Sequence, residues 1–370
     1  MTKKLITTMV QSGDTFKDQL ASYKAAIDEA LSCYVVDIEN STAEQFGVYP
    51  AEAVQAFSAV LDRGGKRIRG ALAMVAYEMF GGTDTALITK AACALEFLNT
   101  YILIADDIQD RSETRRGGKT AHIILKDYHQ ENYLSGDPHH FGEAIAINSF
   151  LIAQHYAMNL LATLNTDAET RLKAIQNVNL YFIATAHGQT QDIFNEVTPK
   201  VTEQDVMNVM EWKTAYYTFV NPLQLGAILA GASDAELATL ADYGRHAGVT
   251  FQLTDDILGI FSDQSESGKS PLDDIKEGKR TLLVVYALKH AQKSDVYFLE
   301  QCLGNQNLTM AEFEHCRRIL TDSGALAYAQ KMAAESATAA TEVIAKNTNW
   351  PQNTKQFMLD LVQYLVVRKS

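Results

Sequence analysis

Residues 101–110 read YILIADDIQD, an apolar stretch that ends in three aspartates. On a helix, Asp106 and Asp110 are four residues apart and lie one above the other on the same face, where two like charges repel. Hard divalent cations relieve such repulsion, and Mg²⁺ typically binds one or two carboxylates together with the phosphates of a substrate. The stretch therefore favours a long apolar helix with a magnesium site at its end. A solvated acidic helix end is the alternative.

Basic motifs lie on both sides of these aspartates along the chain. Residues 115–120 read RRGGKT, and the planar donors of arginine suit phosphate oxygens. Residues 64–70 read GGKRIRG, in which the glycine pair ends one helix. We expect Lys66 and Arg69 in the first turn of the next helix, on one face, where a helix N-terminus and two cations form an anion site. A basic surface turn is the alternative for this second motif.

A second acidic pair occurs later in the chain. The sequence FQLTDDILG places Asp255 and Asp256 after another apolar helical stretch. Residues 267–280 then read SGKSPLDDIKEGKR, so that Lys269 and Lys279 follow soon after the acidic pair. This combination again offers carboxylates to a metal ion and lysines to a phosphate. A charged loop is the alternative interpretation.

Proline is scarce in this chain, with 6 in 370 residues, against an average usage of about 5%. Because proline lacks an N–H and clashes with the preceding turn, its scarcity favours helices. Apolar residues recur at helical spacings, and no alternating pattern predicts a β-hairpin. We therefore expect one all-α domain over residues 1–370, with clear loops at 128–141 and 262–278. The expected helices cover residues 51–62, 67–80, 83–110, 142–164, 168–194, 202–219, 221–231, 234–261, 279–293, 310–320, 325–346 and 351–368.

The overall charge excludes several classes of function. There are 32 basic and 45 acidic residues, which gives a net charge of −13. This excess argues against nucleic-acid binding and against a polybasic surface for anionic lipid, although a bound metal ion still permits an anionic substrate. No uninterrupted apolar run approaches the 18 residues of a membrane span, and the four cysteines show no CxxC spacing. We expect a cytoplasmic protein with reduced thiols and no membrane span.

Taken together and in order, these motifs resemble those of the all-trans isoprenyl diphosphate synthases, the family of farnesyl and geranylgeranyl diphosphate synthases. The resemblance covers about residues 60–285. It implies a large helical bundle around a deep central cavity, usually in a homodimer. It also implies a reaction that joins an allylic diphosphate (dimethylallyl, geranyl or farnesyl) to isopentenyl diphosphate, head to tail. The matching stretches are residues 64–70, 106–120, 188–192, 213–214, 251–256 and 274–280.

The resemblance also implies a role for each matching residue. Three Mg²⁺ ions on the allylic diphosphate would be held by Asp106, Asp107, Asp110, Asp255 and Asp256. The allylic diphosphate itself would be bound by Arg115, Lys213 and Lys269, and isopentenyl diphosphate by Lys66, Arg69, Asn99 and Arg116. Lys279 is a further candidate for substrate binding. The residues implied to act directly in catalysis are Asp106, Asp110, Lys213, Thr214, Gln252 and Asp255, with Lys213, Thr214 and Gln252 steadying the carbocation.

The chemistry of this reaction agrees with the residue types. Ionising the bond between carbon and the diphosphate oxygen develops charge on the leaving group, which metal ions and fixed cations stabilise. The allylic cation must be kept from water in an apolar cavity, and helices rich in Ala, Leu, Ile and Phe supply such walls. No protein nucleophile is needed.

Three positions depart from the family pattern. Gly259 replaces the last aspartate of the second acidic motif, as in a known DDxxG variant that has an aspartate a few residues on, here Asp263. Asn99 replaces a His or Gln in the isopentenyl site and reaches less far. Asn148-Ser149 replaces Gly-Asp, with consequences for substrate affinity or dimer packing. We expect activity to survive the change at Gly259.

Product length is expected to depend on the residues before the first acidic motif. Tyr101 lies five residues before Asp106, about 7.5 Å back along the helix, and a bulky side chain there forms part of a cavity floor. The next residue, Ile102, is not aromatic. In the family this pattern is more similar to geranylgeranyl synthases, so we expect a C20 product, with C15 or longer chains as alternatives. Tyr101 as an ordinary core residue is the competing interpretation.

Two other functions compete with this one. A class I terpene cyclase also uses DDxxD and Mg²⁺, but it does not need Lys66 and Arg69, and it usually carries another motif in place of the second aspartate pair. A catalytically silent subunit of a heteromeric prenyl synthase is favoured by the departures at Gly259, Asn99 and Asn148-Ser149. The intact first motif and the set of basic residues argue against it.

Overall fold

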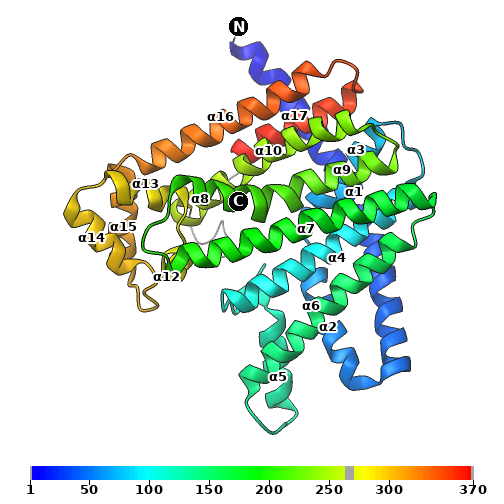
Figure 1. The fold of residues 1–370 in the computed structure, drawn as a ribbon, viewed down its shortest axis with the longest axis horizontal. Helices are drawn as coiled ribbons and strands as arrows, with labels where there is room; N and C mark the ends of the chain where they lie inside the picture. Colours follow the sequence, from blue (N-terminus) through cyan, green and yellow to red (C-terminus); the bar gives the residue numbers. More distant parts are fainter. Residues whose placement is uncertain (1, 263–270, 368–370) are drawn as a thin grey trace. The chain divides into compact units, whose positions relative to one another are not determined.

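The computed structural model describes residues 2–262 and 271–367. Helices account for most of these residues, which confirms the all-α class (Figure 1). In chain order the elements are α1 (Thr2–Phe46), α2 (Val48–Asp62), α3 (Ile68–Met79), α4 (Thr85–Gln109), β1 (Thr114–Arg115), β2 (Gly118–Lys119), α5 (Ala121–Glu131), α6 (Pro138–Ala162), α7 (Ala168–Val197), α8 (Glu203–Val209), the π-helix η1 (Met210–Val220), α9 (Asn221–Leu229), α10 (Asp234–Phe261), α12 (Asp273–Glu277), α13 (Leu282–His290), α14 (Lys293–Cys302), α15 (Met310–Asp322), α16 (Ala325–Lys346) and α17 (Gln352–Val367).

The expected helices are present to within a few residues, and four more were not expected: α1, α5, α12 and α14. The expected loop 128–141 is wrong at both ends, because α5 continues to Glu131 and α6 begins at Pro138. Asp137 caps α6 by accepting a hydrogen bond from the N–H of His139, and Pro138 takes the first helical position, where no N–H is needed. The expected loop 262–278 contains the short helix α12, which Ile275 anchors in the core.

A small hairpin corrects the expectation of no β structure. The strands β1 and β2 pair antiparallel, with Thr114 opposite Lys119 and Arg115 opposite Gly118. The two turn residues both have left-handed backbones, with φ of 52° at Arg116 and 73° at Gly117. This is the geometry of a two-residue hairpin turn. The hairpin is too short to show an alternating sequence pattern.

The chain divides into two compact units, each with its own core. The first unit comprises Met1–Gln176 and Leu225–Gly231, and the second comprises Asn177–Gln224 and Ala232–Ser370. The helices α7 and α9 each continue from one unit into the other. The single-domain organisation expected from the sequence stays a prediction.

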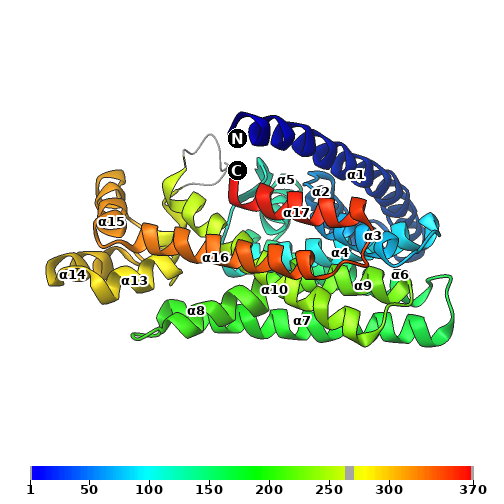
Figure 2. The ribbon, with the colours of Figure 1, turned by 90° about the horizontal axis from the view of Figure 1, so that it is seen from above.

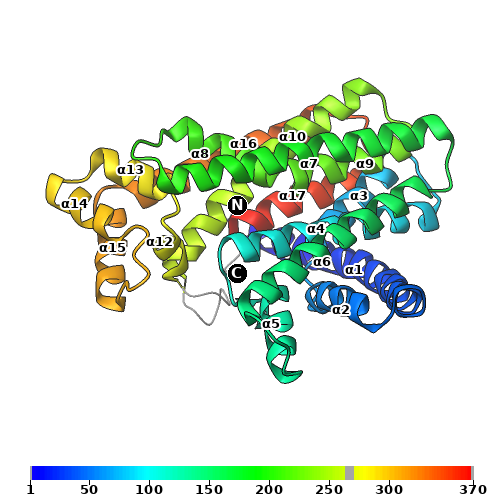
Figure 3. The same ribbon diagram turned by 60° about the horizontal axis from the view of Figure 1, so that its bottom comes forward.

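In the first unit, α4 forms the centre, and α1, α2, α3 and α6 pack against it. Its Phe97 is fully buried and meets Phe57 of α2 edge-to-face at 5.2 Å between ring centroids. The helix α1 lies along α2 and α3 (Figure 2), and α5 and α6 form a helical hairpin (Figure 3). Glycine permits a close approach here, because a Cβ on Gly226 of α9 would lie 2.0 Å from the backbone oxygen of Ala73 in α3.

The helix α4 passes the length and composition test for a membrane span, although the sequence holds no uninterrupted apolar run of that length. However, 72% of its most apolar 18-residue window is buried inside the protein. Such burial is typical of a core helix. The absence of a membrane span stays a prediction.

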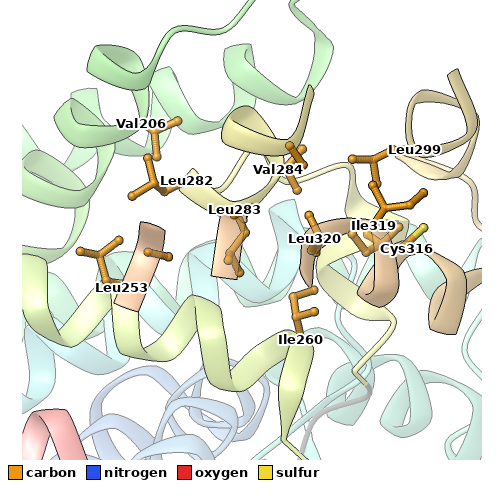
Figure 4. Close-up of a cluster of buried hydrophobic side chains, with 14 of the residues drawn as sticks. Val206, Leu253, Ile260, Leu282, Leu283, Val284, Leu299, Cys316, Ile319 and Leu320 are labelled. Carbon is orange, nitrogen blue, oxygen red and sulfur yellow. The ribbon is translucent and has the colours of Figure 1, made fainter. Parts of the chain in front are cut away.

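In the second unit, α16 lies along α10 (Figure 1), and a cluster of aliphatic side chains joins α10 to α13 and α15 (Figure 4). Leu253 and Ile260 of α10 are at most 1% exposed. The π-helix η1 is held between α7 and α10 by close backbone approaches. A Cβ on Gly188 of α7 would lie 2.4 Å from the backbone nitrogen of Lys213, and a Cβ on Gly248 of α10 would lie 2.3 Å from the Cβ of Ala215.

Candidate active site

The three aspartates of the first acidic motif lie at the C-terminal end of α4. Asp110 caps the helix, and its N–H donates to the backbone oxygen of Asp106 at 2.8 Å, so these residues do lie one turn apart. Arg115 of the hairpin bridges the carboxylates. Its Nη2 is 3.0 Å from Oδ2 of Asp106, and its Nε is 2.5 Å from Oδ1 of the fully buried Asp107. The hairpin thus brings a guanidinium onto the aspartates, as the order of the motifs predicts.

The electrostatics of Arg115 show how closely these charges interact. Burial acts to lower the pKa of its guanidinium, but the charges of Asp107 and Asp106 outweigh burial and raise that pKa above its ordinary value. The arginine therefore neutralises carboxylates that would otherwise repel one another. A metal ion bound there would take over this neutralising role and leave the guanidinium able to bind a phosphate.

The next residue of the hairpin, Arg116, turns to the glycine motif. Its Nη1 donates to the backbone oxygen of Gly64. A Cβ on Gly65 would lie 3.0–3.1 Å from the guanidinium, so a glycine fits best at this position. Desolvation and then the charge of Arg69 lower the pKa of Arg116, while the carboxylate of Glu96 acts to raise it. Crowded cations of this kind form a site for a polyanion.

The structure corrects the placement of Lys66. It lies before α3, which begins at Ile68 with Arg67 as its N-cap residue, and its side chain is exposed. Arg69 is in the first turn, as expected. Asn99 lies on α4 and is 3% exposed, and its Oδ1 accepts no hydrogen bond within residues 2–262 and 271–367.

The second unit joins three of the sequence motifs through short hydrogen bonds. Lys213 of η1 donates to Oδ2 of Asp192 in α7 at 2.6 Å. The next residue, Thr214, donates to Oε1 of Gln252 in α10 at 2.7 Å, and Nε2 of Gln252 donates to Oδ1 of Asp256 at 2.7 Å. Sequence reasoning assigned no role to Asp192, although its motif GQTQD was recognised.

Four carboxylates influence one another in this unit. Desolvation, and then the negative charge of Asp274, raise the pKa of Asp256 well above its ordinary value, and Asp255 and Asp192 add to the effect. Asp274 also explains the departure at Gly259, because a Cβ there would lie 2.7 Å from Oδ2 of Asp274. The glycine makes room for a carboxylate from another element, and Asp274 was missed as a site residue from the sequence.

These oxygen donors fit Mg²⁺. Crowded carboxylates attract a divalent cation, and Mg²⁺ prefers oxygen ligands. Within the described parts of the chain, no group of three or more His, Cys, Asp or Glu side chains is placed so that it could hold a metal ion. A Mg²⁺ ion held by fewer carboxylates would need water or substrate phosphates to complete its shell.

The remaining candidates are less closely connected. Nζ of Lys279 lies 3.3 Å from a carboxylate oxygen of Glu277 and 3.8 Å from one of Glu196. Lys269 and Asp263 lie outside the described residues. Ser149 is buried and bonds to its own helix, whereas the exposed Asn148 lines a largely apolar pocket of about 720 Å³ with residues of α1 and α2.

The two candidates for the chain-length floor lie on α4, and both are half-buried. The ring of Tyr101 meets that of Phe150 in α6 edge-to-face, with 5.5 Å between their centroids.

Comparison with known proteins decides the family. A sequence model of the polyprenyl synthetases matches residues 50–320. The chain belongs to the polyprenyl synthetase family. The resemblance inferred from the motifs is therefore confirmed. This polyprenyl synthetase is 29% identical to the geranylgeranyl diphosphate synthase of Methanosarcina mazei, over 96% of this chain and 98% of that one.

Two further relatives extend the comparison. A short chain isoprenyl diphosphate synthase of Methanothermobacter thermautotrophicus is 33% identical, over 78% of this chain and 80% of that one. Among solved structures, geranylgeranyl pyrophosphate synthase from Corynebacterium glutamicum, complexed with isoprenyl diphosphate and magnesium, matches with a TM-score of 0.83 and 27% identity. That match covers 97% of this chain and 99% of the other.

Proposed function

We propose that this polyprenyl synthetase joins an allylic diphosphate to isopentenyl diphosphate, head to tail, with geranylgeranyl diphosphate (C20) as its main product. The observation that carries the proposal is that two adjacent arginines of one hairpin contact different motifs. Arg115 lies on the acidic motif, and Arg116 lies on the glycine motif. Two adjacent cations thus lie beside two candidate diphosphate-binding sites, as a reaction between two diphosphates requires.

We assign the allylic diphosphate to the carboxylates and cations of the two acidic motifs. Asp106, Asp110, Asp255 and Asp256, with Asp107 beside them, would hold three Mg²⁺ ions. Bound Mg²⁺ supplies positive charge that stabilises the departing diphosphate. Arg115 and Lys213, which are paired with carboxylates in this structure, would then donate hydrogen bonds to phosphate oxygens.

The carbocation needs oxygen dipoles in place of water. Thr214 and Gln252 are hydrogen-bonded to each other, so the orientation of both side chains is fixed before the substrate arrives. Lys66, Arg69 and Arg116 would bind the diphosphate of the isopentenyl substrate, which keeps its diphosphate throughout the reaction. The departed diphosphate would accept the final proton, so no protein base is required.

Product length is assigned to α4. Tyr101 lies 7.5 Å or so from Asp106 along the helix axis, and its contact with Phe150 holds the ring in place. An aromatic stop at this distance supports C20, and the geranylgeranyl diphosphate synthases among the relatives support the same length.

The chain is also expected to form a homodimer. Apolar side chains are exposed on α6 and α7, among them Ile147 at 42%, Leu180 at 62% and Ile183 at 58%. Leu180 and Ile183 lie on successive turns of α7, and exposed apolar side chains that lie close together favour a protein contact. Light scattering of the purified chain tests this, and a monomer would contradict it. A cytoplasmic location stays a prediction from composition.

The direct test is to incubate the purified chain with Mg²⁺, isopentenyl diphosphate and each allylic primer in turn. A C20 diphosphate from at least one primer is expected. No product from any primer would overturn the proposal and favour a silent subunit. A hydrocarbon formed from the allylic diphosphate alone would favour a terpene cyclase.

A further inference from the structure

The turn between α2 and α3 is built around one buried guanidinium. Arg67 has a left-handed backbone, with φ of 49°, and is 6% exposed. Its Nε donates to Oδ1 of Asp28 in α1 at 2.8 Å, and its Nη2 donates to the backbone oxygen of Leu61 in α2 at 3.0 Å. Its Nη1 donates to Oε2 of Glu96 in α4 at 3.3 Å. The turn that carries Lys66 is thus bonded to three helices.

Glu96 contacts the glycine motif a second time. This side chain is 2% exposed, and its Oε1 accepts a hydrogen bond from the N–H of Gly70 at 3.2 Å. The first N–H groups of a helix lack intrahelical partners, so this carboxylate satisfies one of them and fixes where α3 begins. A Cβ on Gly70 would lie 2.5 Å from Cδ1 of Ile27, so the helix start is also closely packed.

The charge of Glu96 has an effect on the anion site. Desolvation and the charges of Arg69, Arg115 and Arg67 all lower the pKa of Arg116, and the charge of Glu96 opposes them. The carboxylate of Glu96 therefore reduces the repulsion among the arginines when no diphosphate is bound. Its role would be to keep these cations ordered when the site is empty of substrate.

We propose that Glu96 is a positioning residue for isopentenyl diphosphate. Through Arg67 and the N–H of Gly70 it fixes the backbone that presents Lys66 and Arg69, and it touches no substrate itself. This inference rests on the proposed function. Binding to an ordered site avoids the entropy loss of ordering it, so a loosened turn weakens binding of isopentenyl diphosphate. The ionisation step at the aspartates is left unchanged.

The test compares Glu96→Gln with a matched variant, Glu78→Gln. Glu96→Gln can still accept from Gly70 but loses the charge that binds Arg67. Glu78 accepts a hydrogen bond from Tyr23 of α1 at the other end of α3, at 2.7 Å. Removing a charged hydrogen bond typically weakens a site about tenfold. We therefore expect Glu96→Gln to raise KM for isopentenyl diphosphate about tenfold, with KM for the allylic substrate and kcat changed less than about threefold.

Glu78→Gln is expected to leave both KM values unchanged. Calorimetric titration of Glu96→Gln with isopentenyl diphosphate alone should show the same loss of affinity as the KM. Equal changes in the two KM values, or an unchanged KM for isopentenyl diphosphate, would overturn the inference. A wild-type chain that forms no product would instead overturn the proposed function.

A second variant guards against simple unfolding. Replacing a buried ion pair with apolar residues of similar size is often neutral for stability. Arg67→Met/Glu96→Gln should therefore keep its helical circular dichroism, because it removes both buried charges and keeps an oxygen that can accept from the N–H of Gly70, while isopentenyl diphosphate still binds about tenfold more weakly or worse. A folded double variant with wild-type affinity for isopentenyl diphosphate would also overturn the inference.

Discussion

The carboxylate of Asp106 pairs with the guanidinium of Arg115 in this structure, and it is a candidate ligand for a metal ion in the working enzyme. With Mg²⁺ bound, its carboxylate would hold the metal ion, and Arg115, which pairs with it in this structure, would be left to bind a phosphate. Asp106→Ala removes this candidate metal ligand. Of its two aspartate partners, Asp106 and Asp107, Arg115 then keeps only Asp107. We expect turnover to fall at least about a hundredfold, because electrostatic stabilisation of the leaving group is lost. Product formation per enzyme, with helical circular dichroism as the measure of folding, checks this.

Asp127→Ala is the matched control for Asp106→Ala. Asp127 lies on α5 and pairs with the exposed Lys119. Its loss is expected to change turnover by less than about twofold, as for most surface ion pairs. Retained turnover in Asp106→Ala would refute the metal assignment.

The second acidic motif usually ends in an aspartate, and this chain has Gly259 at that position. We expect Asp274 to supply the missing carboxylate. It influences Asp256 and lies against the glycine. We expect Asp274→Asn to lower kcat about tenfold and to raise the Mg²⁺ concentration needed for half-maximal rate, as losses next to a metal commonly do. A magnesium titration of the initial rate measures both. Asp273→Asn, one residue earlier, is the control, and an equal response of the two variants would contradict the assignment.

Residues of one charge can have different roles that the sequence does not distinguish. In GGKRIRG the sequence pointed to Lys66 and Arg69, whereas Arg67 is the one that is buried and bonded to Asp28 and Glu96. Asp274 was missed because it is distant in sequence from Gly259. Burial and long-range contacts decide such roles, and a linear motif shows neither.

The helices α4 and α6 meet at two aromatic rings that we assign to product length. If Tyr101 limits the chain, Phe150 holds it in place, and truncating either ring should open the same space. We expect Tyr101→Ala and Phe150→Ala each to shift the main product beyond C20, and the double variant to add little, because contacting residues are not additive. Chromatography of the dephosphorylated products measures the chain lengths.

Phe141→Ala is the control for these variants, since Phe141 lies on the same helix and packs on His129 instead. Its product length should stay as in the wild type. Unchanged products from Tyr101→Ala would show that Tyr101 is an ordinary core residue.

The packing of α7 on η1 gives a prediction about stability and activity together. Gly188→Ala places a methyl group 2.4 Å from the nitrogen of Lys213, so one helix must move. Overpacking of this kind typically costs about 1–3 kcal/mol of unfolding free energy. The shift also separates Lys213 from Asp192, so kcat should fall. Urea unfolding and initial rates check both effects, with Thr190→Ala on the exposed side of α7 as control. Wild-type stability in Gly188→Ala would contradict the packing argument.

Elements with strong periodicity were predictable from the sequence, and those with weak or short signals were not. The helix α1 has a buried stripe at Ile27, Leu31, Val35 and Ile38, which is a helical spacing, but the rest of the helix is largely polar. The hairpin of β1 and β2 was missed because two-residue strands have no period to detect. Its turn residues, Arg116 and Gly117, are the signal that could have found it.

At the scale of the whole molecule, the net charge of −13 becomes part of the proposed chemistry. An acidic chain that binds two diphosphates needs positive charge from outside. In the proposed function the carboxylates Asp106, Asp255 and Asp256 would attract it as Mg²⁺, and basic residues such as Arg115 and Lys213 would bind the phosphates. Mg²⁺ and diphosphate should therefore bind together, because the positive charge of the metal ion balances the negative charges of the diphosphate and the carboxylates.

Thermal unfolding tests this coupling on the full chain. A ligand at 100 times its Kd adds about 2.7 kcal/mol to stability, which for a chain of this size corresponds to a rise in Tm of roughly 3–4 °C. We expect Mg²⁺ and inorganic pyrophosphate together to give such a rise, and Mg²⁺ alone to give much less, because the described side chains form no complete metal site. Asp106→Ala should lose most of the rise. A full rise with Mg²⁺ alone would mean that the protein holds the metal without a diphosphate, and would contradict the coupled binding.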